Sequence, residues 1–279
     1  MRKLRRAGAA VAVMSLVLTL SAFTRGGMRS TATVVPGGPM VTAGGQPRPA
    51  SGPARGSRSR HTVIHSLNWA GYAANRARTT FRYVSAAFTV PYVHCPGTTT
   101  SYSSHWVGLD GLGSSSVEQV GIEADCSGST PQYYAWFEMY PKPVSIAFPV
   151  HAGNAVQASV SYERSSRKFV LMLRDTTNGR HLIRTLKCAA RTCQRSSAEV
   201  ISEAPSNGSG GILPLADYRA VGFSSVTVTT SRGHRSGLRS RLWNTYQIVA
   251  VGASSHKLEG QPTSLFHGQA FSTYWFRAS

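Results

Sequence analysis

Hydrophobic and polar positions alternate in short runs from residue 61 to the end of the sequence. The runs are rich in Val, Tyr, Phe, Thr and Ser and are separated by Gly, Pro or Asn, which is typical of β-strands. No amphipathic helical stretch and no repeat of fixed period is visible. The pattern predicts about twelve strands. They are expected at residues 82–93, 104–109, 117–124, 132–140, 144–150, 155–163, 168–174, 181–186, 198–202, 220–229, 246–252 and 270–277.

One hairpin is marked by its turn. Asn178-Gly179 lies between the apolar run 169–173 and Leu182-Ile183, and Asn-Gly between two apolar runs predicts a two-residue turn. Residues 61–279 number 279 − 60 = 219, which is enough for one sizeable core. We therefore expect a single all-β domain made of two packed antiparallel sheets.

The N-terminal part of the sequence has a different character. Residues 1–6 are basic and residues 7–23 are apolar, which predicts a secretory signal at 1–22 that is cleaved at Ala22 or a neighbour; a single membrane anchor is the alternative. Residues 23–60 are rich in Gly, Pro, Ser and Arg, which predicts a disordered basic pro-segment or linker. The expected protein is secreted, with no stable membrane association after signal cleavage.

The charge is strongly positive, at +19 for the whole sequence. Residues 61–279 hold 20 basic and 11 acidic residues, a balance of 20 − 11 = +9. Such a charge is compatible with nucleic acid or an anionic cell-wall polymer as a partner. However, the basic residues are scattered apart from 232–241, and no nucleic-acid-binding motif accompanies them. We therefore expect a monomer with an arginine-rich surface and no nucleic-acid partner.

Four cysteines, an even number, predict two disulfides in a secreted chain. Cys188 and Cys193 can close a local loop, which leaves Cys95 to pair with Cys126. Nine histidines are present, but neither a CxxC nor an HExxH spacing occurs. The sequence therefore predicts no metal site and no cofactor.

Several of the few acidic residues lie inside aromatic, strand-like segments. Carboxyl groups buried beside aromatic rings cost free energy unless they are paired or used, so these segments are candidates for chemistry. The pattern alone leaves open a lectin-like carbohydrate-binding sandwich, a glycosidase with two catalytic carboxyl groups and another hydrolase. Because alternate residues of a strand share a face, a set of possible groove residues can be collected. They are Trp106, Asp110, Gln119, Glu123, Trp136, Glu138, Tyr140, Glu199 and Glu203.

Between residues 66 and 229 the chain resembles the glutamic peptidases, the eqolisin family, as a bacterial-type member. Six segments carry the resemblance, in the order in which that family has them. They are Asn68-Trp-Ala-Gly-Tyr72, Ala86-Ala-Phe-Thr-Val-Pro91, Trp106-Val-Gly-Leu-Asp-Gly111, Gln119-Val-Gly121, Ala135-Trp-Phe-Glu-Met-Tyr-Pro141 and Ala198-Glu-Val-Ile-Ser-Glu203.

The resemblance implies a concanavalin-like sandwich of two curved antiparallel sheets with the active site on the concave face. It implies an endopeptidase that hydrolyses protein or peptide substrates with an activated water and without a covalent intermediate. Gln119 and Glu203 would be the catalytic pair. The basic composition departs from the acidic fungal members, which argues against a very low pH optimum.

The same resemblance gives roles to five further residues. Asp110 and Glu138 would support Glu203 by orienting it or tuning its pKa. Trp106, Trp136 and Tyr140 would line the substrate cleft.

Overall fold

Sixteen β-strands and no helix make up the part of the chain that the computed structural model describes, namely residues 38–42, 61–207 and 209–278. The all-β prediction is therefore confirmed. The strands are β1 His61–Ser66, β2 Trp69–Asn75, β3 Phe81–Thr89, β4 Ser104–Leu109, β5 Val117–Ser127, β6 Thr130–Tyr140, β7 Ser145–Pro149, β8 Ala155–Glu163, β9 Lys168–Asp175, β10 His181–Leu186, β11 Ser197–Glu203, β12 Ala220–Thr230, β13 Arg235–Ser236, β14 Asn244–Val251, β15 Leu258–Pro262 and β16 Phe271–Trp275.

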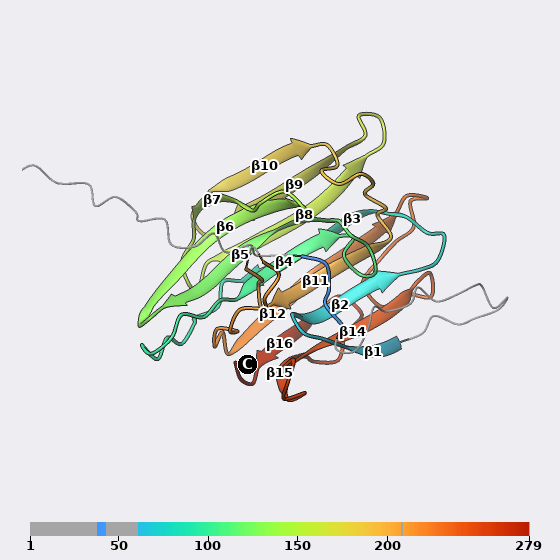
Figure 1. The fold of residues 1–279 in the computed structure, drawn as a ribbon. Coiled ribbons are helices and arrows are strands. Elements are labelled where there is room, and N and C mark those ends of the chain that lie inside the picture. The colour runs from blue at the N-terminus through green and yellow to red at the C-terminus, as the bar shows by residue number, and fades with distance from the viewer. Residues whose placement is uncertain (1–37, 43–60, 208, 279) are drawn as a thin grey trace, which may run out of the picture. The chain divides into compact units, whose positions relative to one another are not determined.

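The strands follow one hydrogen-bonded path that folds back on itself (Figure 1). Its order is β10-β9-β8-β3-β12-β16-β15-β14-β2-β11-β4-β5-β6-β7, and all these pairs are antiparallel. Strands β4 and β5 pack on β3, β8 and β9 across the core, so the two halves of the path form the layers of a sandwich. Outside this path, β1 pairs with β14 in parallel and β13 pairs with β12.

Strands β4 and β11 and nearly all of β5 are buried on both faces. Side chains on one face, such as Val107, Val120 and Val200, belong to the main apolar core between the layers. Side chains on the other face, such as Trp106 and Ile201, form a second, smaller cluster. We call this second side the site face, because it holds most of the polar candidates that the sequence singled out.

All twelve expected segments contain a strand, and four further strands were not expected. Residues 104–109, 155–163 and 181–186 are strands with the expected bounds, and the Asn178-Gly179 hairpin joins β9 to β10 with a φ of 74° at Gly179. Polar and apolar residues do not alternate in β2, where nearly every side chain is buried, or in β15, which contains Glu, Gly, Gln and Pro. Alternation also does not mark β1 or the two-residue β13.

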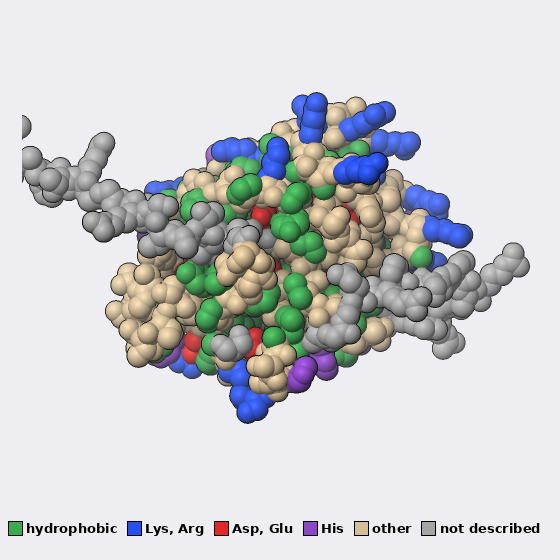
Figure 2. All heavy atoms as spheres, in the orientation of Figure 1, with side chains coloured by type: hydrophobic (Ala, Val, Ile, Leu, Met, Phe, Trp, Pro, Cys, Tyr) green, Lys and Arg blue, Asp and Glu red, His purple; other side chains and the backbone are tan. Residues whose placement is uncertain are grey.

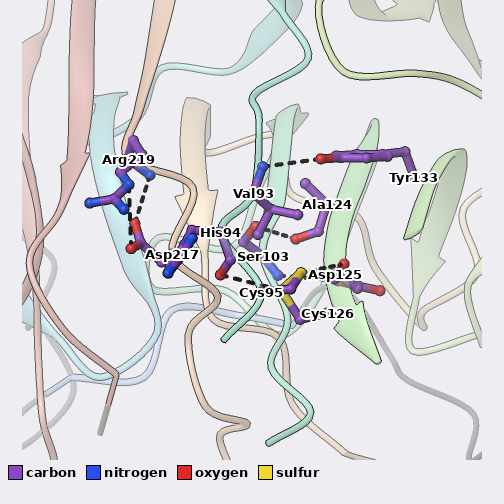
Figure 3. Close-up of a disulfide and its surroundings, with 10 residues drawn as sticks. All are labelled: Val93, His94, Cys95, Ser103, Ala124, Asp125, Cys126, Tyr133, Asp217 and Arg219. Carbon is purple, nitrogen blue, oxygen red and sulfur yellow. Dashed lines mark hydrogen bonds and ion pairs between the residues drawn. A yellow bond between two sulfur atoms is a disulfide. The ribbon is translucent and has the colours of Figure 1, made fainter. Parts of the chain in front are cut away.

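Both disulfides form as expected. Cys95–Cys126 ties the segment before β4 to β5 (Figure 3). Ser101 and Cys126 exchange two backbone hydrogen bonds beside it. Cys188–Cys193 closes a loop between β10 and β11.

The predicted signal at 1–22 lies outside the described residues, as does most of the predicted pro-segment. Of residues 23–60, only 38–42 are described. Within the described part of the chain, no helix is long and apolar enough to cross a membrane.

Candidate active site

Strand register brings the predicted groove residues of four neighbouring strands onto one face. In one row across the sheet, Glu199 lies opposite Gly108, Gly108 opposite Gln119, and Gln119 opposite Glu138. In a second row, Glu203 and Glu123 flank Ser104. The sequence predicted that these side chains share faces within their strands, and the order β11-β4-β5-β6 makes those faces continuous.

Glu203 is fully buried and is held by two neutral donors. Asn68 donates from Nδ2 to Oε1 at 3.0 Å, and the indole of Trp106 donates from Nε1 to Oε2 at 2.8 Å. Trp106 packs edge-on against Trp69, with ring centroids 5.0 Å apart. The position of the carboxyl group is therefore fixed by side chains from β4 and from the turn before β2.

Gln119 forms the second polar centre and is also fully buried. Its Nε2 donates to Oε2 of Glu138 at 2.6 Å. This hydrogen bond fixes the orientation of the Gln119 carboxamide against the carboxyl group of Glu138.

Glu203 and Gln119 lie two strands apart on the same sheet, and their partners on β4, Ser104 and Gly108, are four residues apart. No hydrogen bond joins the two side chains directly in the described structure. Glu138 interacts with both residues. It accepts a hydrogen bond from Gln119, and the negative charge of Glu203 helps to raise the pKa of Glu138.

Burial is the largest cause of the pKa shifts of the carboxyl groups on the site face. It raises the pKa values of Glu203, Glu138, Glu123 and Glu199 well above the ordinary value for glutamic acid. Hydrogen bonds from Trp106 and Asn68 oppose this effect at Glu203, because they favour the ionised form. No basic residue is among the causes that act on these four groups, so the site favours the protonated state of its carboxyl groups.

Asp110 is bound to the backbone just before β11. Its carboxylate accepts hydrogen bonds from the backbone N–H groups of Arg195 at 2.6 Å and Ser196 at 2.8 Å, and it makes no hydrogen bond to Glu203. Its own φ of 69° turns the chain sharply after β4. Asp110 therefore anchors the beginning of β11, the strand whose last residue is Glu203.

The three aromatic candidates differ in accessibility. Trp106 and Trp136 are fully buried, whereas Tyr140 is half-buried at the end of β6. Trp106 therefore contacts the carboxyl group directly rather than forming an open cleft wall. Two glycines make room for it: a Cβ at Gly121 would lie 2.5 Å from Trp106 Cβ, and one at Gly108 would lie 2.9 Å from its ring.

Sequence reasoning missed two features of this face. Asn68 was part of a recognised segment but was given no role, although it binds Glu203. Asp125 continues the alternation of β5 past Glu123 and accepts hydrogen bonds from Ser103 N and the Tyr134 hydroxyl, both at 3.2 Å. Following the alternation to the end of the strand would have found Asp125.

Residues 38–42 lie against the site face. Met40 is buried in the same apolar cluster as Trp69 and Trp106, and its N–H donates to Gly111 O at 3.2 Å. The N–H of Val41 donates to Oδ1 of Asn68 at 2.9 Å, the same amide that binds Glu203. We call residues 38–42 the covering segment.

No group of three or more His, Cys, Asp or Glu in the described ranges is arranged to hold a metal ion.

The described chain is a β-sandwich with a cluster of carboxyl groups and one carboxamide on one sheet. The sequence profile of the Peptidase A4 family matches residues 67–259. The chain therefore belongs to this family, the glutamic peptidases, and is a peptidase.

Solved structures of glutamic peptidases share the fold. Scytalido-glutamic peptidase with a transition state analog inhibitor is 22% identical over 75% of this chain and 98% of its own, with a TM-score of 0.63. SCP-B, an eqolisin in complex with the tripeptide Ala-Ile-His, is 21% identical over the same shares, with a TM-score of 0.60. Aspergilloglutamic peptidase from Aspergillus niger is 20% identical over 63% of this chain and 99% of its own, with a TM-score of 0.53. No protein of curated function matches the sequence.

Proposed function

We propose that this peptidase is a secreted monomeric endopeptidase in which Glu203 and Gln119 activate one water molecule. Ionised Glu203 takes a proton from the water, and the resulting hydroxide adds to the peptide carbonyl carbon. Gln119 donates an N–H to the oxyanion that forms. The proton on Glu203 then passes to the leaving nitrogen as the C–N bond breaks, so no covalent intermediate is formed.

The hydrogen bond between Gln119 and Glu138 is the observation that carries this proposal. A carboxamide has two N–H donors, and Glu138 accepts from the Nε2 group. One N–H is thereby fixed in direction, and the second remains for the oxyanion. Preorganised donors of this kind lower a barrier because they need no reorientation during the reaction. Glu138 is the supporting residue in this scheme, and Trp106 and Asn68 orient the base.

Single substitutions test these roles. Glu203→Gln removes the base and should lower kcat/KM on a denatured protein substrate by about 10² to 10⁴. Gln119→Ala removes the oxyanion donor and should cost about 10² to 10³. Matched controls are Glu163→Gln and Gln157→Ala, both at exposed positions. Full activity in either site variant would refute the proposed pair, and an unaffected Gln119→Ala would favour a glycosidase or a lectin.

We also propose that the full chain is a precursor whose covering segment occupies the substrate-binding side of the site. Met40 fills an apolar position beside Trp69 and Leu112, while the backbone of Val41 binds the amide that holds Glu203. Peptide backbones bind through the same kind of hydrogen bond, with side chains in pockets. Residue 40 lies in the predicted pro-segment at 23–60, so proteolysis after it would uncover the site.

A further inference from the structure

A cavity whose lining includes none of the candidate site residues gathers much of the positive charge of the domain. Its volume is about 1320 Å³, and its lining comes from four separate segments: residues 78–83, 161–167, Arg195 and residues 229–235. Seven arginines line it. They are Arg78, Arg82, Arg164, Arg167, Arg195, Arg232 and Arg235. Along the sequence only Arg232 and Arg235 belong to a basic run, and the fold brings the other five arginines beside them.

Almost nothing in the protein neutralises this charge. Glu163 is the one acidic residue in the lining, and none of the seven arginines forms an ion pair in the described structure. Nine of the 11 acidic residues are buried, leaving Glu163 and Asp217 to balance 20 basic residues of the domain. Figure 2 shows Lys and Arg side chains along the upper margin of one face, around a hydrophobic middle. Clustered guanidinium groups repel one another, so an anion bound among them would be stabilised.

Three of the seven arginines hold the left-handed backbone conformation. Their φ values are 60° at Arg78, 54° at Arg167 and 53° at Arg195. Residues other than Gly and Asn rarely adopt it, at a cost of about 1–3 kcal/mol each. Such conformations concentrate at ligand-binding sites, where the surrounding structure maintains them because they direct side chains. Three of the eight non-Gly residues with this conformation in the described chain thus lie around one cavity, where the backbone helps to direct their side chains.

We propose that this cavity binds a polymer of phosphate groups. Guanidinium groups match phosphate oxygens with paired hydrogen bonds, and the hydroxyl groups of the lining, including Ser161, Ser165 and Thr230, add neutral donors. A single phosphate would engage only a few of seven arginines, whereas a chain of phosphates fits a cavity of this size. The site would hold the peptidase on a phosphate-rich polymer, in free form or as part of a cell envelope.

Nucleic acid fits the cavity less well than a phosphate chain without bases. Recognition of single strands relies on aromatic rings that stack on bases. Two aromatic residues line the cavity, Tyr83, which is half-buried, and Tyr162, whose ring is covered by Arg195 with the guanidinium carbon 3.8 Å from the ring centroid. The lining therefore offers seven arginines and several hydroxyl groups but at most one uncovered aromatic ring.

The test compares two triple variants of the full chain that lose the same charge. Arg82→Gln/Arg232→Gln/Arg235→Gln alters the cavity, and Arg174→Gln/Arg191→Gln/Arg277→Gln alters exposed arginines outside its lining. Binding of fluorescently labelled inorganic polyphosphate, poly(glycerol phosphate) and single-stranded DNA is measured by anisotropy over a series of NaCl concentrations. The first two probes distinguish a free phosphate chain from an envelope-type polymer.

The cavity variant should bind the phosphate polymers at least about tenfold more weakly than the control variant, since each charge-assisted contact contributes about tenfold. Its affinity should also depend less steeply on salt. Peptidase activity should be the same in both variants, so a failure here leaves the catalytic proposal untouched. Equal losses in the two variants, no binding of either phosphate polymer, or tighter binding of DNA would each overturn the proposed site.

Discussion

At the scale of single residues, the pKa of Glu203 depends on two opposing effects. Burial raises it well above the ordinary value, and the donors Trp106 and Asn68 lower it because they bind the ionised form. A general base must be ionised, so activity should fall on the acidic side as Glu203 takes up a proton. The acidic limb of kcat/KM should therefore lie above about pH 4.3, the value for an unperturbed glutamic acid.

Trp106→Phe keeps an aromatic ring in place but removes the N–H donor to Glu203. Losing a hydrogen bond to the ionised form raises the pKa of Glu203 further, so the acidic limb of kcat/KM should move up by about one pH unit. The measurement is the pH profile of peptide hydrolysis. Trp243→Phe is the control, because Trp243 is equally buried but donates to the backbone oxygen of Leu238. An unchanged or lowered limb in Trp106→Phe would contradict the role given to this indole.

At the scale of strands, β4 and β5 are packed so closely around Trp106 that glycine is required beside it. A Cβ at Gly121 would lie 2.4 Å from the backbone oxygen of His105 and 2.5 Å from Trp106 Cβ, and backbone cannot yield as a flexible side chain can. This packing fixes the direction of the indole and, through it, the position of Glu203.

Gly121→Ala should accordingly destabilise the domain by about 1–3 kcal/mol, since an added methyl group must push strands apart. Gly222→Ala in β12 is the control, because its added Cβ would meet Ser272 Oγ at 3.6 Å, an ordinary contact. Urea denaturation followed by tryptophan fluorescence compares the free energies of unfolding. Equal stability of the two variants would show that β4 and β5 can separate without cost.

Sequence patterns predicted most of the strands, and the strands and contacts that they missed have physical reasons. Alternation reveals a strand with one polar face, so β8 was predicted with its bounds. β2 is buried on both faces and consists largely of Ala and Gly, so it shows neither alternation nor a β-branched run and was missed by this criterion. Alternation also shows which residues share a face but not which strands are neighbours, so contacts such as Asn68 to Glu203, 135 residues apart, could not be derived.

At the scale of the whole molecule, acidic residues point inward and basic residues outward. Nine of 11 acidic residues are buried, and no Lys or Arg among the described residues is, so the net charge of the domain understates how basic its surface is. The covering segment is held to the site face by Met40 and backbone hydrogen bonds, with no ion pair. Its attachment should therefore be insensitive to salt.

Met40→Asp should weaken this attachment, because an ionised side chain cannot replace a buried thioether without a large desolvation cost. The initial rate of peptide hydrolysis by the unprocessed chain should rise. Val41→Asp is the control within the same segment, since the side chain of Val41 is 39% exposed. Gel analysis confirms that each sample is unprocessed when the rate is taken. A rate unchanged by Met40→Asp would mean that residues 38–42 do not restrict access to the site.

The central claim is that Glu203 and Gln119, on strands β11 and β5, act on the same water molecule. Groups that act as a unit show strongly non-additive losses, whereas independent groups show losses that multiply. The direct measurement is a double-mutant cycle of kcat/KM with Glu203→Gln, Gln119→Ala and the double variant. We expect the double variant to be about as slow as the slower single variant; a loss equal to the product of the two single losses would contradict the shared role.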